Sequence, residues 1–456
     1  MTENTGRAIN IPYGGDATTS TPGTDGSDIV FLRDMRKKFE EAADSWNEIF
    51  QEGKEDLAFL MGDQWDSEIK NQRKLEKRPC LTVNYLTRLV DIAIGDFRQN
   101  RIRINVRPAD DHGDVKIAKI FEGIIRQIQN KSKAEVVYDT ASEQSLKSSF
   151  GAFRITTKYV PNSFEQEIWI ERIVNPHSVM FDPDARKQDF SDAKWCFVVD
   201  YMKKEMFERK YPDAAIMDFS GTSSGQPYVG WFEKDKVRIC EYWEVVEKEI
   251  ELVQLVTGDV VEYDATIPAD FIALDEAGNE RKRMDTKRVI HQYIVSGADI
   301  LEGPNEWLGK YIPIIPVLGR ECWVENKRNL TSLIRFAKDA QRMLNYWRTA
   351  STEHVALSPK APIMVTADQI EGHEQEWRDM NVKPTTYIVY NGRTGDPVPQ
   401  RMAPPPVPSG ILQEASNCVG DIQTITNMHE AVTGQPSNER SGKAISARQR
   451  QSNIST

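Results

Sequence analysis

The chain has no long apolar run: its 456 residues contain no stretch of about 18 consecutive apolar residues. The N-terminal stretch MTENTGRAINIPYGG also lacks the apolar segment of a secretory signal. We therefore expect neither membrane insertion nor secretion.

Paired cysteines and histidines are also missing. The five cysteines are single, widely spaced and odd in number, and no C-x-x-C pair occurs among Cys80, Cys196, Cys240, Cys322 and Cys418. The six histidines form no H-x-x-x-H pair. This pattern favours free thiols in a reducing compartment over a disulfide framework or a zinc site.

Nucleotide and hydrolase motifs are absent as well. No G-x-x-x-x-G-K-[ST], G-x-G-x-x-G or G-x-S-x-G occurs. The segment SNERSGK, residues 437–443, lacks the first glycine of a phosphate loop and follows a predicted helix instead of a strand. We expect no bound cofactor, no metal and no enzymatic activity.

An excess of positive charge is lacking too. The chain has 58 Lys and Arg residues against 69 Asp and Glu residues, a net charge of −11. Proteins that hold duplex DNA tightly neutralise its phosphates with a basic surface. The balance disfavours a sequence-reading DNA binder, whereas a conduit through which DNA slides is compatible with net acidity.

The length permits two or three structural units with a substantial core. Residues 1–26 are rich in Gly, Thr, Asp and Pro, which is typical of a flexible arm. Apolar residues then recur at helical spacing. Helices are predicted at about 27–60, 84–97, 113–129, 133–148, 268–276 and 411–430.

Alternating and β-branched segments fill much of the remainder. Strands are predicted at about 101–108, 152–160, 166–174, 195–200, 237–253 and 260–263, with a small β unit over 286–318. The three strands between 152 and 200 are predicted to form an antiparallel meander. Helices and strands are segregated along the chain, so the predicted fold class is α+β.

The most informative segment is Tyr311–Asn345, YIPIIPVLGRECWVENKRNLTSLIRFAKDAQRMLN. Pro313 and Pro316 remove two backbone donors from its apolar strand, which predicts a strand at a sheet edge or a bend. Apolar residues then follow helical spacing from Leu330 to Trp347, which predicts a helix of about 25 residues.

Cations cover much of the rest of that predicted helix. They are Lys327, Arg328, Arg335, Lys338, Arg342 and Arg348. One interpretation is a solvated helix face paired with Asp339 or Glu325. The other is a row of weak phosphate contacts, and the residues alone do not decide between them.

An acidic cluster offers the main catalytic alternative, a metal-dependent nuclease. Its carboxylates are Asp182, Asp184, Asp189 and Asp192. However, Pro183 separates the first two, and no partner carboxylate or histidine is evident nearby. The other interpretation is a set of turn residues in loops.

The Tyr311–Asn345 segment resembles the portal proteins of short-tailed double-stranded DNA bacteriophages. Six other segments agree in order, and the resemblance extends from about Phe31 to Arg450. They are DLAFLMGDQW (56–65), RIRINVRPAD (101–110), SSFGAFRI (148–155), VNPHSVMFDPDA (174–185), EYWEVVEKE (241–249) and SGKAISARQR (441–450).

The resemblance implies a portal-like fold with a wing of helices and antiparallel sheet, a long stem helix and a small β-rich clip. It implies the following division: 1–26 a flexible arm, 27–264 the wing, 265–328 a first stem element with the clip, 329–356 the second stem helix, 357–427 the return through the wing, and 428–456 a tunnel loop with the start of a helix rising to a crown. Family members usually continue beyond SGKAISARQR. Since this sequence ends at Thr456, we expect the crown to be missing, through truncation, true absence or a second reading frame.

The resemblance also implies site residues. Those expected to face a DNA channel are Arg328, Arg335, Lys338 and Arg342. Those expected in a tunnel loop are Gln435, Ser437, Asn438, Glu439, Arg440 and Lys443. Those expected on the clip, contacting terminase and then the head–tail adaptor, are Glu302, Asn305, Glu306 and Trp307.

The implied function is a dodecameric ring at one capsid vertex that conducts DNA during packaging and ejection. The implied partners are further copies of the chain, double-stranded DNA without sequence preference, the terminase large subunit, the head–tail adaptor, and capsid and scaffolding proteins. The location is the virion, after assembly in the host cytoplasm. A head–tail connector without a DNA-facing role remains an alternative.

Overall fold

The computed structural model of the chain is divided by its contacts into two compact units. Unit 1 comprises Met1–Leu57 and Ile94–Leu333, and unit 2 comprises Ala58–Ala93 and Ile334–Thr456. The residues described are 26–100, 103–108, 114–212, 214, 232–233, 235–264, 267–268, 271–274, 280–296, 299–357, 363–380, 386–393, 395, 397–401 and 409–428. Among them, no helix is both long and apolar enough to cross a membrane.

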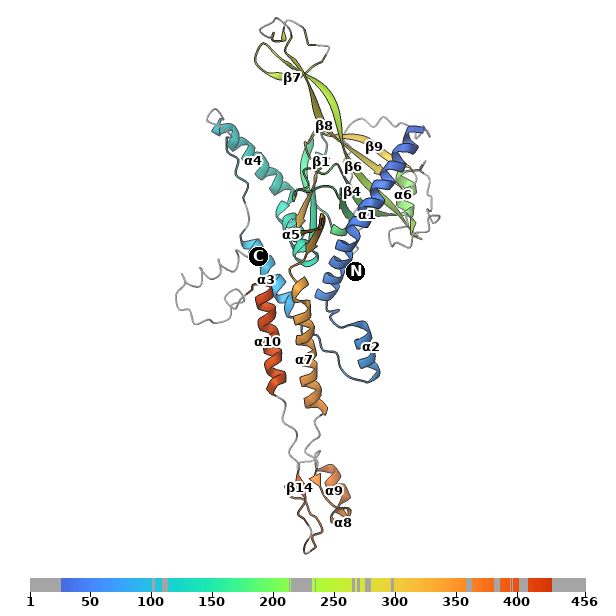
Figure 1. Cartoon of the computed structure of the whole chain (residues 1–456), viewed down its shortest axis with the longest axis vertical. Helices are drawn as coiled ribbons and strands as arrows, with labels where there is room; N and C mark the ends of the chain where they lie inside the picture. Colours follow the sequence, from blue (N-terminus) through green and yellow to red (C-terminus); the bar gives the residue numbers. More distant parts are fainter. Residues whose placement is uncertain are drawn as a thin grey trace. The chain divides into compact units, whose positions relative to one another are not determined.

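The helices of unit 1 flank its sheets (Figure 1). They are α1 (Gly26–Leu60, of which the part up to Leu57 belongs to this unit), α4 (Val115–Ser132), α5 (Ala134–Ser148), α6 (Lys204–Lys210) and the 3-10 turn η1 (Pro176–Ser178). The predictions for α1, α4 and α5 are confirmed. On α1, the periodic residues Met35, Phe39, Ala42, Trp46 and Ile49 are all buried.

The largest sheet of unit 1 has seven antiparallel strands, with the main order β3-β4-β6-β8-β9. Its members are β3 (Val179–Phe181), β4 (Trp195–Lys203), β5 (Phe232–Glu233), β6 (Lys236–Gln254), β7 (Val260–Glu262), β8 (Lys282–Val295) and β9 (Ile300–Trp307). The stretch 286–318 is largely strand, as predicted, but it does not form a small β unit of its own, because β8 pairs with β6 along its length.

A second sheet, with the order β10-β1-β2, contains β1 (Phe150–Tyr159), β2 (Gln166–Arg172) and β10 (Ile314–Leu318). β10 pairs only with β1, which confirms the edge position predicted from its prolines. The predicted meander is wrong, since β1 and β2 lie in a different sheet from β4. Gly151 on β1 permits close packing, because a Cβ at this position would lie 2.0 Å from the Ala141 carbonyl oxygen of α5.

The core of unit 1 packs α1 against both sheets. Trp46 packs edge-on against Phe150 with ring centroids 5.1 Å apart, and its indole N–H donates to the Phe181 carbonyl oxygen at 2.9 Å. Phe39 packs edge-on against Phe197 at 5.4 Å. One helix thereby joins strands from two sheets into one apolar core.

The predicted long helix begins later than the periodicity indicates. Its first residues form a hairpin of β11 (Arg320–Val324) and β12 (Lys327–Thr331), and the helix α7 spans Lys338–Leu357 after a 3-10 turn, η3 (Arg335–Ala337). The turn residues Glu325 and Asn326 adopt positive φ values of 50° and 63°, as a two-residue hairpin turn requires.

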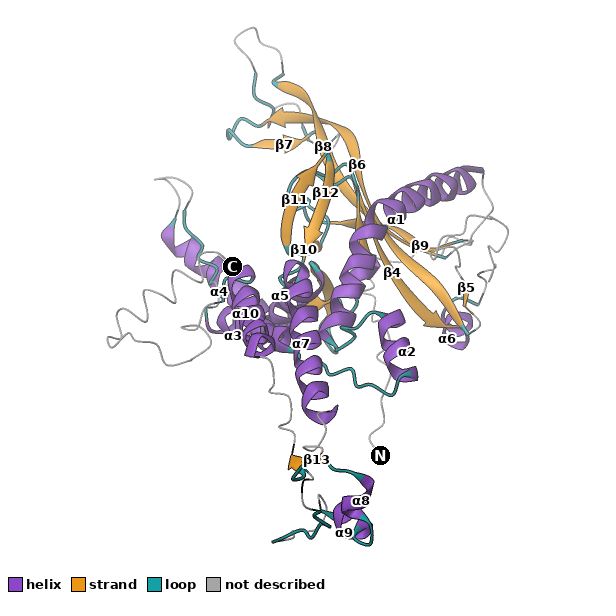
Figure 2. Ribbon diagram, turned by 60° about the horizontal axis from the view of Figure 1, so that its bottom comes forward, coloured by secondary structure: helices purple, strands orange, loops and turns teal. Residues whose placement is uncertain are grey.

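Two further predictions fail in unit 1. Residues 103–108, within the predicted strand at 101–108, are irregular. In the predicted helix at 268–276, the described residues Ile272 and Leu274 form isolated antiparallel bridges to Leu255 and Glu280. Beyond the residues that pair with β4 and β9, β6 and β8 continue together as a ribbon, and β7 pairs with the far end of β6 (Figure 2).

Unit 2 is built around two antiparallel helices, α7 and α10 (Ser409–Ile425), which pack side by side. Its other elements are α2 (Ser67–Leu75), most of α3 (Tyr85–Gln99), α8 (Ala367–Ile370), α9 (Glu374–Asp379), β13 (Ile363–Met364) and β14 (Gln400–Arg401). The predictions for α3 and α10 are confirmed. Residues 363–401, which contain α8, α9, β13 and β14, form a small lobe inserted between the two paired helices.

Candidate functional site

The four cations expected to share one helix face do not lie on one helix. Arg328 lies on the strand β12 of unit 1 and is half-buried. Its guanidinium lies 4.0 Å from the ring centroid of Phe190 and 4.9 Å from that of Trp323. It also forms an ion pair with Glu321 at 2.9 Å, and burial lowers the pKa of this guanidinium below its ordinary value although Glu321 opposes the shift. Arg328 is thus committed to contacts within its own unit.

The other three cations lie at the start of α7 in unit 2. Lys338 is only 9% exposed, with its Nζ 5.7 Å from the Phe59 ring centroid. Arg342 is exposed, forms an ion pair with Asp339 at 3.0 Å and also lies over Phe59. Arg335 lies on η3 and is partly exposed. Of the four, Arg342 has the most exposed side chain.

Sequence reasoning missed a row of buried polar side chains on α7. Gln341, Asn345 and Thr349, which we call the polar ladder, are exposed by 1% or less. They are spaced four residues apart and so lie on one helix face. Buried polar groups are costly unless they are hydrogen-bonded, so the partners of these three residues identify what this face of α7 holds.

The partner of the polar ladder is an extended backbone segment, residues 78–84, which we call the strap. Thr349 Oγ1 accepts from the Leu81 N–H at 3.2 Å, and Asn345 Oδ1 accepts from the Val83 N–H at 2.8 Å. At the start of α3, Gln341 Oε1 accepts from the Tyr85 N–H at 3.1 Å. Each side chain of the polar ladder therefore binds a backbone amide.

The two spacings explain why this pairing works. Four helical residues rise about 6.0 Å. Two extended residues advance about 6.6 Å. The amides of Leu81, Val83 and Tyr85 therefore meet every fourth residue of α7 at three successive contacts, with the two chain segments antiparallel. Gln341 Nε2 also donates to the Val83 carbonyl oxygen at 2.7 Å, so both backbone groups of that residue are satisfied.

An ion-pair cluster closes the C-terminal end of this arrangement. Glu353, four residues beyond Thr349, is 8% exposed and forms ion pairs with Arg73 on α2 and with Arg78, the latter at 3.3 Å. Arg73 also lies over the Trp65 ring, with 5.5 Å from its Cζ to the ring centroid. These contacts anchor α2, which has no buried residue of its own, to α7.

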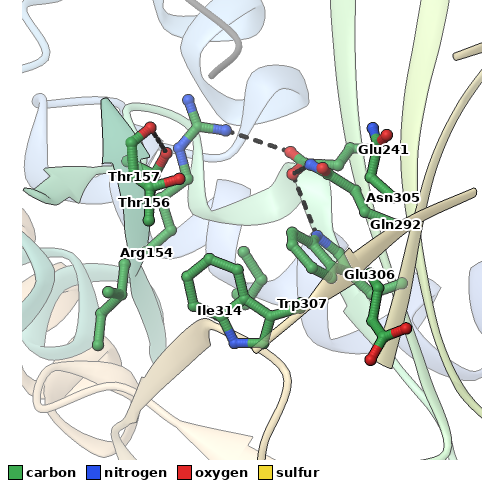
Figure 3. A pocket seen from close by; sticks show the side chains of 11 residues that line it. Arg154, Thr156, Thr157, Glu241, Gln292, Asn305, Glu306, Trp307 and Ile314 are labelled. Carbon is green, nitrogen blue, oxygen red and sulfur yellow. Dashed lines mark hydrogen bonds and ion pairs between the residues drawn. The ribbon is translucent and has the colours of Figure 1, made fainter. Parts of the chain in front are cut away.

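The four residues expected to bind terminase lie on β9, at the edge of the seven-stranded sheet. Asn305, Glu306 and Trp307 line a cavity of about 70 Å³ that lies against β1, β6 and β8 (Figure 3). Glu302 instead forms an ion pair with Lys210 of α6 at 3.1 Å. The sheet therefore brings three of the four together.

A saturated carboxylate dominates this cavity. Glu241 accepts hydrogen bonds from Gln292 Nε2 at 2.6 Å, from Trp243 Nε1 at 3.1 Å and from Arg154 at 3.2 Å (Figure 3). Trp243 in turn packs edge-on against Trp307 at 6.0 Å. Because three donors already occupy this carboxylate, the arrangement suits a rigid surface better than acid–base chemistry.

The acidic cluster of the nuclease alternative does not converge on one point. Asp182 accepts from the backbone N–H groups of Asp184 at 3.0 Å and Lys194 at 3.1 Å, and Asp192 accepts from that of Arg186 at 2.8 Å. A hydrogen bond from the Ser191 backbone lowers the pKa of Asp189. Within the described residues, no group of three or more His, Cys, Asp or Glu side chains is arranged to hold a metal ion.

The expected tunnel loop could not be placed. Its residues lie outside the part of the chain that the structure describes, namely Gln435, Ser437, Asn438, Glu439, Arg440 and Lys443.

Comparison with known proteins identifies the family. The family described as phage P22-like portal protein matches residues 36–456. A curated portal protein of Acyrthosiphon pisum secondary endosymbiont phage 1 is 27% identical over 409 residues, which are 84% of this chain and 56% of that relative. The chain thus spans little more than half the length of this relative. The match over most of the chain shows that the chain belongs to the phage P22-like portal protein family.

Proposed function

We propose that the chain is a subunit of a dodecameric ring at one capsid vertex, where the ring forms the channel for DNA packaging and ejection. Membership of the portal family supports this function. The role is structural: the ring conducts DNA and docks other proteins, while a separate terminase supplies the energy. The virion is its place of action.

The observation that carries the proposal is the α7–α10 pair. Long helices that line a conduit must keep their direction under load, and α7 is fixed along its length by α10, the polar ladder and the Glu353 ion pairs. The contacts of the polar ladder and of Glu353 are polar and buried, which makes them directional. A channel wall of this kind needs little contribution from exposed charge.

We assign the DNA-facing role to Arg342 and Arg335. Arg328 and Lys338 are set aside because both are largely buried: the Arg328 side chain and Lys338 are each only 9% exposed. One or two exposed cations per subunit, repeated around a ring, would give a weak and even attraction for phosphates. Gln435–Lys443 remains the proposed tunnel loop.

We assign docking of terminase and the head–tail adaptor first to the lobe at residues 363–401. The lobe is inserted between the paired helices α7 and α10, so it marks one end of that pair. It also exposes the large apolar side chains of Met364, Tyr387 and Val398. Exposed apolar residues are suited to exchangeable protein contacts. The β9 edge with Glu302, Asn305, Glu306 and Trp307 is a second docking surface.

Two measurements test this function. Native mass spectrometry and negative-stain images should show a closed ring with a central hole, whereas a monomer at all concentrations would refute it. Charge reversal at Arg335 and Arg342 together should then reduce the DNA packaged into capsids without preventing ring closure. Reversal of the exposed Arg283 on the ribbon is the matched control. Unchanged packaging in the double variant would favour a connector without a DNA-facing role.

A further inference from the structure

The N-terminal turns of α4 expose an apolar row. Ile117, Ile120, Phe121 and Ile124 are 52%, 62%, 54% and 47% exposed. Their spacing of three and four residues places them on one face of the helix. Together they expose an apolar patch on the order of 400 Å², a size that marks interaction sites on soluble proteins.

The row is exposed because only the C-terminal end of α4 is held by its own unit. There, Ile128 packs into a small core with Val137 and Ile170. Ser132 Oγ accepts from the Ile170 N–H at 3.1 Å. The preceding turns extend away from the β1–β2 sheet, so nothing in the described part of the unit covers the row (Figure 1).

The polar side of α4 is positively charged. Lys116, Lys119 and Arg126 are exposed there, and Glu122, the one acidic residue of the helix, pairs with Arg126 at 2.8 Å. The whole chain carries a net charge of −11. A basic, amphipathic helix on an acidic chain is therefore complementary to much of the remaining surface of the same chain.

The complementary face lies on α1, on the opposite side of the sheets of unit 1 (Figures 1 and 2). Its solvent side carries the exposed carboxylates Glu40, Glu41, Asp44, Glu48 and Glu55, which outnumber the exposed cations Arg33, Lys37 and Lys54 of the same helix. Glu48 already pairs with Lys327, so the carboxylates on offer are centred on Glu41 and Asp44. At its N-terminal end, Ile29 and Val30 are about 60% exposed (59% and 61%).

We propose that α4 of one copy docks against the exposed face of α1 in the next copy of the chain. This inference rests on the proposed ring and names the surfaces that close it. Two different, complementary faces on opposite flanks of one subunit are the requirement for a heterologous interface that closes into a ring. The apolar row meets Ile29 and Val30, and the lysines meet the carboxylates.

Other binding partners for the exposed surface of α4 account for fewer of these observations. Duplex DNA would use the lysines and leave the apolar row in water. An anionic membrane would use both sides of α4 and leave the acidic face of α1 without a role. A second copy uses all three features at once.

The test is a charge exchange between the two helices. Lys116→Glu with Lys119→Glu on α4, and separately Glu41→Lys with Asp44→Lys on α1, should each lower the fraction of chain in rings at least about tenfold. All four substitutions in one chain should restore the rings, because the pairing is reversed as a whole. All these positions are exposed in the single subunit, so circular dichroism and the melting temperature should not change.

Controls separate this interface from the ring itself. Lys248→Glu, an equivalent reversal on the exposed ribbon, should leave rings intact. Rings that persist in both double variants would overturn the α4–α1 interface and leave the proposed function standing. If rings persist while the α4 variant loses binding to a DNA duplex or to anionic vesicles, α4 serves that ligand and the proposal is wrong. A wild-type chain that forms no ring overturns the proposed function and the interface together.

Discussion

Replacing Asn345 with leucine removes the central member of the polar ladder while nearly conserving side-chain volume. Asn345 accepts from the Val83 N–H at 2.8 Å and donates to Gln64 Oε1 at 2.6 Å. Asn345 is 1% exposed and Gln64 is 2% exposed, so water cannot reach the Gln64 oxygen without local opening, whereas the hydrogen bond of the Val83 N–H is part-buried. The substitution leaves a buried acceptor on Gln64 and a part-buried donor on Val83 unsatisfied.

The magnitude follows from those two orphaned groups. Each costs about 1–3 kcal/mol. Burying the added apolar surface of leucine offsets part of this, by about 1–2 kcal/mol. The net loss of stability for closing the strap on α7 is therefore about 3 kcal/mol, which corresponds to a roughly 150-fold larger population of the open state.

Native-state hydrogen exchange measures this population residue by residue. The Val83 and Tyr85 amides should exchange roughly 150-fold faster in Asn345→Leu. Thr349→Val should accelerate the Leu81 amide by a smaller factor, because it removes a single acceptor. Thr352→Val is the matched control, since Thr352 is exposed and bonds only to the Arg348 carbonyl oxygen of its own helix. Unchanged exchange at Val83 in Asn345→Leu would refute the ladder as the element that holds the strap.

Three further predictions concern unit 1. Burial lowers the pKa of His177 from its ordinary value of 6.5 to about 4, so the unfolded chain binds more protons between these values. Stability should fall by about 3 kcal/mol as the pH drops from 6.5 towards 4, and His177→Gln should remove this dependence in urea titrations. Gly151→Ala places a Cβ 2.0 Å from a backbone oxygen and should lower the free energy of unfolding by about 3 kcal/mol or more, whereas Gly123→Ala on the exposed side of α4 should raise it by up to about 1 kcal/mol. Arg328→Lys keeps the charge but loses the planar contact with two aromatic rings, and should cost about 1–2 kcal/mol by the same titration.

Each of these three predictions has an outcome that would contradict it. If the free energy of unfolding of His177→Gln still falls in the same way as the pH drops, another titratable group causes the loss of stability at low pH. Equal stability of the Gly151→Ala and Gly123→Ala variants would contradict the close approach of β1 to α5. A neutral Arg328→Lys would return Arg328 to the set of candidate DNA contacts.

Elements with strong local periodicity were predicted well from the sequence. On α1, the apolar residues at helical spacing are the buried ones, because a long amphipathic helix packs on a sheet with its apolar face. The prolines of Tyr311–Asn345 placed β10 at an edge for a local reason, the loss of two donors. The family was also predictable, since the resemblance depended on several segments in order and not on a single residue.

The failures share a non-local cause. Leu330 and Ile334 follow helical spacing, but the turn at Glu325 and Asn326 lets residues 327–331 pair with 320–324 instead. The assignment of β8 and β9 to a separate unit failed because strand partners far apart in sequence carry no local signal.

The polar ladder was not predicted for a related reason. Gln341, Asn345 and Thr349 have the composition of a helix surface, so hydropathy assigns them to solvent although their partners bury them. In the same way, nothing local distinguishes Arg328, which is used inside unit 1, from Arg342, which is exposed. A residue type predicts which chemistry a side chain can perform, but it does not predict which neighbouring group the side chain contacts in the folded chain.

The step match between α7 and the strap has an evolutionary consequence. Because α7 binds backbone groups, substitutions at Leu81 or Val83 leave the pairing intact, and related portal proteins can diverge freely in those side chains. Insertion or deletion of one residue would instead shift every later amide out of step with α7. We expect this segment to vary in composition among relatives while its length stays constant, and positions 341, 345 and 349 to change only together.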